Sequence, residues 1–209
     1  MLPRNCKRWT LSAAAILLSA SVLHAALPTS PEVSGPTSFT GQLLIAAPAL
    51  RGTAFKRTVI LVAQHNRAGA LGIVINRPLD ERSIAGLLEA FGADASGVKN
   101  TVRIFLGGPV NPAVAFVVHS ADYHLADTLD IDGRVALTVA PDVLRDMGLG
   151  KGPNKSLVAF GCAGWGPSQL DAEVGRGDWY IVPEDPALVF DDDRAKLWID
   201  AMARHKPTQ

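Results

Sequence analysis

The sequence predicts an α+β fold with a mixed β-sheet, and three observations support this class. Strand-like and helix-like segments alternate irregularly, whereas a doubly wound parallel sheet needs a regular alternation. The β-rich runs 58–63 and 70–75 are separated by a short glycine-containing loop, as in a hairpin. Three apolar runs pass directly into turns rich in glycine or proline, which predicts three tight corners. These runs lie at 71–75, 102–106 and 157–161.

Strands are predicted where a short apolar run is bounded by turn-forming residues. The first run ends at Pro48, and the later runs end at glycines, prolines or short polar turns. In chain order, the predicted strands lie at 42–47, 58–63, 70–75, 102–106, 113–119, 134–139, 157–161 and 179–182.

Four helices are predicted, each with a recognisable start or end. Apolar side chains recur at helical spacing in the first helix, and Gly92 follows it as a stop. Pro141 and Pro167 each open a helix. Asp191–Asp193 stand before the last helix as a cap. In chain order, the predicted helices lie at 83–91, 142–147, 167–174 and 194–204.

The first 25 residues predict a secretory signal peptide. Three basic residues precede an uncharged apolar run at 9–23, and small residues surround Ala25. The run is shorter than the roughly 20 residues that a membrane span needs. We therefore expect cleavage near Ala25 and export to the periplasm, with no membrane span left in the mature chain. An uncleaved leader or a miscalled start codon is the alternative, and either would leave the protein in the cytoplasm.

Residues 26–39 are rich in Pro, Ser and Thr and predict a flexible linker, and residues 40–205 predict a single globular domain. Without residues 1–25, 17 basic residues face 20 acidic ones, so the formal charge is −3. A mildly acidic chain lacks the basic surface that phosphate contacts require, which disfavours direct binding of nucleic acid. Cys6 leaves with the leader, so Cys162 has no partner for an internal disulfide.

A set of motifs follows a distinctive order along the domain. The motifs are Gly41–Ala46, Gly69–Pro78, Gly107–Val110, Phe116–His119, Gly164–Gly166, Gln169–Glu173 and Trp179. In this order they resemble the YqgE/AlgH family of bacterial proteins, over about residues 40–203. The resemblance implies a bifurcated or barrel-like β-sheet surrounded by helices, and it implies no established chemistry. Some members are called transcriptional regulators of exopolysaccharide production, a label that brings no DNA-contacting motif with it.

Two features depart from the family pattern. Family members look like leaderless cytoplasmic proteins, whereas this chain has an export-like extension. Cys162 stands where the family more usually has an aromatic residue, in the pattern Gly-Tyr-Ala-Gly-Trp. A contact that the aromatic ring makes in family members is therefore not expected at this position.

The residues at the corners are candidates for binding. They are Asn76, Arg77, Pro78, Gly107, Gly108, Pro109, His119, Gly164, Trp165 and Gln169. The Arg77 guanidinium could bind a carboxylate or phosphate through its fork of donors, or it could hold a loop through backbone carbonyls. Trp165 and Gln169 could clamp their corner to the sheet, or they could line a small-molecule groove.

Cys162 is the candidate for redox or thiol chemistry. It follows a predicted strand and precedes the helix opened by Pro167, whose N-terminus could lower the thiol pKa. Lone cysteines are also common as inert core residues. A nucleophilic pair would need a histidine nearby in space, and His65, His119 and His124 are available in principle.

No spacing of metal ligands or nucleotide-binding glycines is recognisable. Reading 128–133 as the start of a calcium loop places Val139 where the bidentate glutamate belongs, so a calcium site is rejected. We therefore expect a non-enzymatic binding or regulatory protein without a metal or cofactor, whose partner is a protein or a small anionic ligand. The alternative is a thiol-dependent enzyme or redox sensor that uses Cys162.

Overall fold

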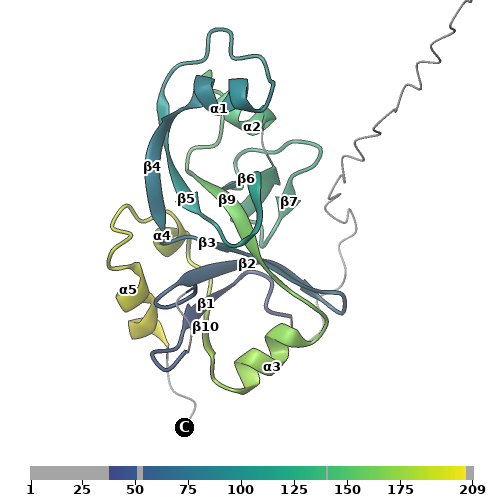
Figure 1. The fold of residues 1–209 in the computed structure, drawn as a ribbon, viewed down its shortest axis with the longest axis vertical. Coiled ribbons are helices and arrows are strands. Elements are labelled where there is room, and N and C mark those ends of the chain that lie inside the picture. Colours follow the sequence, from purple (N-terminus) through teal and green to yellow (C-terminus); the bar gives the residue numbers. More distant parts are fainter. Residues whose placement is uncertain (1–37, 51–53, 140, 206–209) are drawn as a thin grey trace, which may run out of the picture.

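The computed structural model describes residues 38–50, 54–139 and 141–205. These residues form ten strands and five helices (Figure 1). The strands are β1 (Gln42–Ala46), β2 (Val59–Asn66), β3 (Gly69–Val74), β4 (Pro78–Ser83), β5 (Thr101–Leu106), β6 (Val110–Ser120), β7 (Leu129–Asp130), β8 (Val135–Val139), β9 (Ser156–Trp165) and β10 (Trp179–Pro183). The helices are α1 (Ile84–Ala90), α2 (Asp142–Gly148), α3 (Gln169–Gly175), α4 (Pro186–Val189) and α5 (Leu197–Arg204).

The strands form one curled sheet that bifurcates at β9. Its main path runs β10-β1-β2-β3-β9-β6-β8-β7, and every pairing along this path is antiparallel. β5 branches from β9 as a parallel neighbour, and β4 pairs with β5 in the antiparallel sense. The predicted α+β class with a mixed, bifurcated sheet is therefore confirmed.

β9 belongs to both parts of the sheet, and it bends at Gly161. Residues 156–160 and Cys162 pair with β6, and residues 163–165 pair with β3. Figure 1 shows β9 running from the upper part of the molecule, beside β5 and β6, to the lower part. Gly161 has φ +73°, a conformation that glycine adopts at least cost.

Two of the predicted glycine corners meet at this bend. A Cβ added to Gly108 would overlap the backbone of Cys162, and a Cβ added to Gly161 would overlap the carbonyl oxygen of Gly108. A Cβ on Gly107 would likewise overlap the carbonyl oxygen of Gly161. We call Gly107, Gly108 and Gly161 the glycine crossing, because two backbones approach here more closely than side chains permit.

The prediction that 161–166 forms a turn was wrong, since β9 continues to Trp165. β3 supplies backbone partners for residues 163–165, so the glycines serve a bend and a close approach within a strand. The last helix begins at Leu197, and Lys196 is its N-cap, so Asp191–Asp193 do not cap it. Asp193 instead pairs with Lys196 at 2.8 Å.

β4, β7 and α4 were not predicted. All six residues of β4 are exposed, so it has no alternation of apolar and polar side chains to reveal it. β7 has two residues and α4 has four, which is too short for a periodic pattern.

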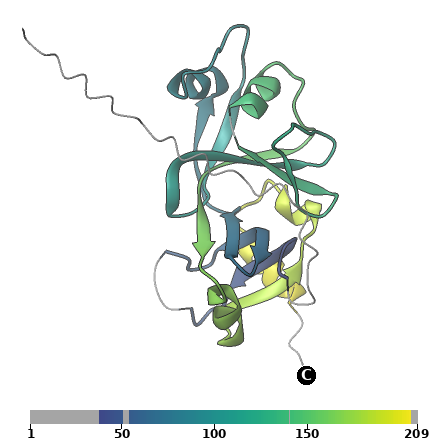
Figure 2. The same cartoon turned by 90° about the vertical axis from the view of Figure 1, so that its right-hand side faces the viewer.

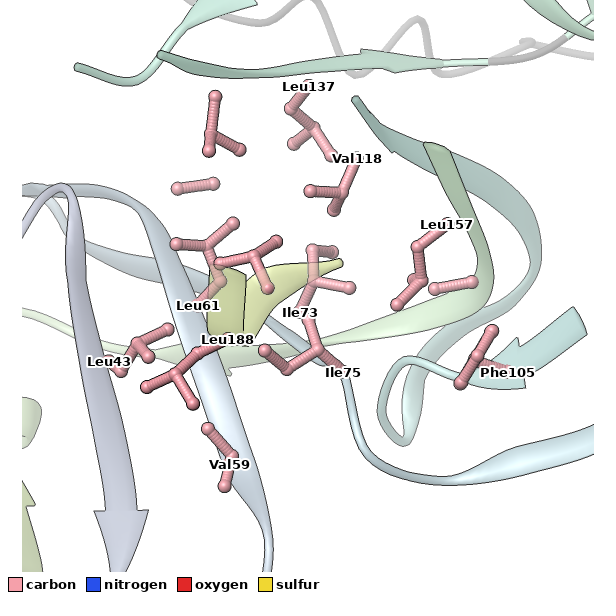
Figure 3. Packing of buried hydrophobic residues seen from close by; sticks show 14 of the residues in the cluster. Leu43, Val59, Leu61, Ile73, Ile75, Phe105, Val118, Leu137, Leu157 and Leu188 are labelled. Atoms are coloured by element: carbon pink, nitrogen blue, oxygen red, sulfur yellow. The ribbon is translucent and has the colours of Figure 1, made fainter. Parts of the chain in front are cut away.

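One core connects both parts of the sheet. Side chains of β1, β2 and β3 pack with those of β6, β8 and β9 in a single buried cluster. Figure 3 shows Leu61 and Ile73 facing Val118 and Leu137 across this core. Figures 1 and 2 place α1 and α2 at one end of the molecule and α3 at the other. Within the described ranges, no helix combines the length and the apolar character that crossing a membrane requires.

Candidate functional site

The Asn76–Pro78 and Gly107–Pro109 corners lie side by side. The N–H of Leu106 donates to the carbonyl oxygen of Arg77 at 2.9 Å, and the N–H of Val74 donates to that of Gly107 at 2.9 Å. The first bond holds the start of β4 against the end of β5, and the second holds the end of β3 against the second corner.

The polar side chains of the first corner are used internally. Asn76 Oδ1 accepts from the N–H of Val59 at 2.9 Å, and its Nδ2 donates to the carbonyl oxygen of Arg57 at 2.9 Å. Arg77 Nη2 donates to the carbonyl oxygen of Lys56 at 3.2 Å. Of the two roles considered for Arg77, holding a loop through carbonyls is the one that the contacts describe.

A groove of about 610 Å³ opens beside these two corners, between β4, α1 and β5. Its wall is mainly apolar, and its large side chains are Leu79, Leu87, Ile104, Leu106, Pro112 and Phe160. Leu79 directly follows the first corner and is 57% exposed. We call this hollow the β4 groove.

The rim of the β4 groove carries a weak ion pair. Arg82 lies in the lining, and its Nη2 is 3.2 Å from Asp80 Oδ2. Both side chains are more than half exposed, so solvent screens the pair and its contribution to stability is small. The Arg82 guanidinium is therefore free to exchange Asp80 for another acidic group.

The third corner meets the second at its Gly161 end, while its Trp165–Gln169 end lies against α3. The indole N–H groups of Trp165 and Trp179 both donate to Glu173 Oε2, at 2.9 and 2.8 Å. Gln169 Nε2 donates to Glu173 Oε1 at 2.9 Å, and Gln169 Oε1 accepts from the N–H of Gly166 at 3.1 Å. Although burial by itself would raise the pKa of Glu173, the three donors hold it below its ordinary value. We call this group the tryptophan clamp.

A hollow of about 250 Å³ adjoins the tryptophan clamp. Trp165 and Trp179 are almost fully buried and pack edge to face, so their rings serve mainly to fasten α3 to the sheet. Gly164 also lines this hollow. The predicted corner residues thus separate: those of the first two corners lie beside the β4 groove without lining it, and Gly164, Trp165 and Gln169 lie at the tryptophan clamp.

Comparison with known proteins agrees with this architecture. A family model described as AlgH-like matches residues 43–208. The chain belongs to the AlgH-like family. A UPF0301 protein of Methylococcus capsulatus is 40% identical over 175 residues, covering 84% of this chain and 94% of the relative. One of Gluconobacter oxydans is 41% identical over 165 residues, covering 78% and 88%.

Two solved structures share the AlgH-like fold. The solution structure of the AlgH protein of Pseudomonas aeruginosa superposes with a TM-score of 0.70 at 35% identity, covering 83% of this chain and 92% of that one. The crystal structure of a protein of Corynebacterium diphtheriae has a TM-score of 0.61 at 22% identity, covering 84% and 91%, and shows the similarity of fold alone.

In this AlgH-like chain, His119 is a buried link between β6 and β8. Its Nδ1 lies 3.0 Å from the carbonyl oxygen of Ser120 and therefore carries the proton, so Nε2 accepts from Thr138 Oγ1 at 2.8 Å. Thr138 Oγ1 in turn lies 2.7 Å from Thr128 Oγ1. Burial lowers the pKa of His119, which favours the neutral ring. Both ring nitrogens are thus occupied.

Cys162 was expected after the end of a strand, and this part of the prediction was wrong. Cys162 lies within β9, is 2% exposed, and is separated from α3 by the rest of that strand. Burial raises the pKa of its thiol, which is the opposite of activation by a helix N-terminus. No hydrogen bond or charge from a histidine acts on it among the described residues.

The acidic turn after β7 has a structural role. Asp130 Oδ1 accepts from the N–H of Gly133 at 2.7 Å, and Asp132 Oδ1 accepts from the N–H groups of Arg134 and Val135 at 3.0 Å. In the part of the chain that the structure describes, no group of three His, Cys, Asp or Glu residues is placed to hold a metal ion.

Proposed function

We propose that this AlgH-like protein is a non-enzymatic binding module that holds an apolar segment of a partner protein in the β4 groove. The observation that carries this proposal is a mainly apolar hollow of about 610 Å³ beside the exposed Leu79. Its volume lies in the range of roughly 300–1,000 Å³ that binding sites occupy. Exposed apolar surface rimmed by polar residues is typical of interaction sites.

The charge at the rim indicates what the partner segment carries. Arg82 can release Asp80 at little cost, because both are well exposed. An acidic residue of the partner, next to the partner's large apolar side chains, would form an ion pair with the Arg82 guanidinium. We therefore expect an apolar segment with a flanking Asp or Glu.

The free edge of β4 argues against a second copy of this chain as the occupant. Pro78 has no N–H to offer, and Asp80 Oδ1 accepts from the N–H of Glu81 at 2.8 Å. Three successive charged residues also line this edge, and such devices oppose strand-to-strand pairing. The partner segment is therefore expected to enter the groove over its open face.

A non-enzymatic role is supported by the state of the two side chains best suited to chemistry. The thiol of Cys162 is buried and its pKa is raised, which opposes formation of the thiolate. Both nitrogens of His119 are engaged within the fold. The formal charge of −3 after residue 25 favours a protein partner over nucleic acid.

Leu79→Asp is expected to weaken the complex with the partner by 10- to 100-fold, since burying a leucine is worth about 1.5–3 kcal/mol. Leu79 is exposed, so the free energy of unfolding should hardly change. A photo-crosslinker at position 79 first identifies the partner, and the affinity is then measured by calorimetry with both purified proteins.

Ile199→Asp is the matched control, because Ile199 is 51% exposed on α5, away from the groove. Its affinity should equal that of the unchanged protein. Equal affinities for Leu79→Asp and Ile199→Asp would rule out the β4 groove as the binding site. Crosslinking of position 79 to a small molecule alone would rule out a protein segment as its occupant.

We also propose that the protein is exported. The supporting observation is the leader pattern in the first 25 residues, which lie outside the described residues. We expect the native protein to be found in the periplasmic fraction with an intact mass that starts at Ala26. A cytoplasmic protein of full-length mass would contradict export.

A further inference from the structure

The two ends of the curled sheet meet at a small cluster of charged groups. β10 lies at one end of the strand order and β7 at the other. Glu184 directly follows β10, while Asp132 and Arg134 lie in the turn between β7 and β8. No strand pairing joins these two ends in the described part of the chain, so the side chains make the connection.

One guanidinium holds the cluster together. Arg134 Nη2 lies 2.7 Å from Glu184 Oε2 and 2.9 Å from Asp132 Oδ2, and it donates to the carbonyl oxygen of Glu184 at 3.2 Å. The N–H of Glu184 donates to the carbonyl oxygen of Gly41, just before β1, at 3.2 Å. Arg134 thereby connects the β7–β8 turn to the β10 end of the sheet.

The surroundings of the two carboxyl groups differ. The side chain of Glu184 is fully buried, and neither of its oxygens has a well-formed hydrogen bond. Asp132 accepts backbone N–H groups from Arg134 and Val135, and these favour its ionised form. Arg134 is more than half exposed, so solvent screens its charge, and the fully buried Glu184 is the carboxyl that gains most from keeping a proton.

The proton belongs to Glu184. Burial first, and then the neighbouring Asp132 carboxyl, raise the pKa of Glu184 to about 8, although Arg134 opposes the shift. The nearby charge of Asp185 raises it further, but Asp185 is itself paired with Arg204. The pKa of Asp132 is held below its ordinary value, although burial alone would raise it.

We propose that Glu184, Asp132 and Arg134 form a protonation-dependent latch, which fastens the two ends of the curled sheet while Glu184 is neutral and loosens when Glu184 ionises. Ile131 and Val135 adjoin the latch and belong to the main core, so loosening exposes the edge of that core. The latch makes the closure of the sheet sensitive to pH without any ligand.

The direction of the pH dependence follows from proton linkage. In the closed state Glu184 has a pKa of about 8, whereas in an open, hydrated state it has the ordinary value near 4.5. The closed state therefore binds the proton more tightly and is favoured most in acid. The equilibrium constant for opening should rise about tenfold per pH unit from about 4.5 to about 8 and then level off.

Hydrogen exchange of the full domain tests the latch. Exchange of the Glu184 and Val135 amides is measured from pH 5.5 to 9 by NMR and divided by the intrinsic rate at each pH. The ¹³C shift of the Glu184 carboxyl is followed in the same samples. We expect opening to rise about tenfold per pH unit up to about pH 8, together with a Glu184 titration near pH 8.

Glu184→Gln keeps the shape and carries no titrating proton, so opening should become independent of pH. Asp132→Asn keeps an acceptor for the backbone N–H groups and leaves Glu184 as the carboxyl that Arg134 contacts in the latch. The pKa of Glu184 should therefore fall. Glu89→Gln removes an exposed carboxyl on α1 and should behave like the unchanged protein. A Glu184 titration near 4.5, or equal pH dependence in Glu184→Gln, would overturn the latch.

Discussion

Gly161→Ala is expected to remove most of the stability of the domain. The new methyl group would overlap the carbonyl oxygen of Gly108 and lie 3.0 Å from that of Val110, and φ at this residue is +73°. The positive φ alone costs about 1–2 kcal/mol in a residue with a Cβ. Since backbone atoms of the glycine crossing cannot move as a side chain can, we expect a total loss above about 4 kcal/mol. Urea denaturation followed by circular dichroism measures it.

Gly177→Ala provides the matched control. Gly177 has φ +77°, but an added Cβ would meet nothing within 4 Å. The loss of unfolding free energy in Gly177→Ala should therefore stay near the ~1–2 kcal/mol that the positive φ costs. If both variants lost the same free energy of unfolding, the close approach of the two backbones would not matter to the fold.

Glu173→Ala is expected to lower the free energy of unfolding by about 2–4 kcal/mol, because two nearly buried indole N–H groups lose their acceptor at about 1–3 kcal/mol each and Glu173 is itself only partly buried. The variant leaves the indole N–H groups of Trp165 and Trp179 without an acceptor. It also removes the acceptor of Gln169 Nε2, within the contact between α3 and the sheet. Denaturation followed by tryptophan fluorescence reports on both rings directly.

Gln169→Ala removes one donor and leaves the indole bonds intact, so its loss of unfolding free energy should be about 1 kcal/mol.

The tryptophan clamp also predicts how the stability of the domain depends on acid. Because the pKa of Glu173 is lower in the fold than its ordinary value of 4.5, its contribution is complete above pH 4.5 and is lost as the pH falls through the folded value. A Glu173→Ala variant as stable as Gln169→Ala would contradict the clamp.

Elements with local signals could be predicted from the sequence. The first helix was expected at 83–91, and the structure has Ser83 as its N-cap, with Oγ accepting from the N–H of Gly86 at 3.3 Å. Gly92 follows with φ +70°, as a helix stop should. β4 lacked such a signal. Its exposed residues are held in place by pairing with β5, which lies further along the chain, after α1.

The candidate sites depend on contacts that no local pattern reports. Glycine and proline marked the three corners, but only the fold shows that two of them meet while Trp165 lies by α3. Leu79 is a single apolar residue in a polar strand, so no periodicity singled it out. Glu184 gave no signal either, because its pKa depends on burial and on Asp132 and Arg134, about fifty positions earlier.

The position of β9 has a consequence for biosynthesis. β9 joins both parts of the sheet, and β1 pairs with β10 near the other end of the chain. Neither part can therefore be completed until most of the 209 residues have left the ribosome. Such dependence on distant segments slows folding. The nascent chain therefore cannot close its sheet through most of translation, and its apolar strands stay unpaired for that time.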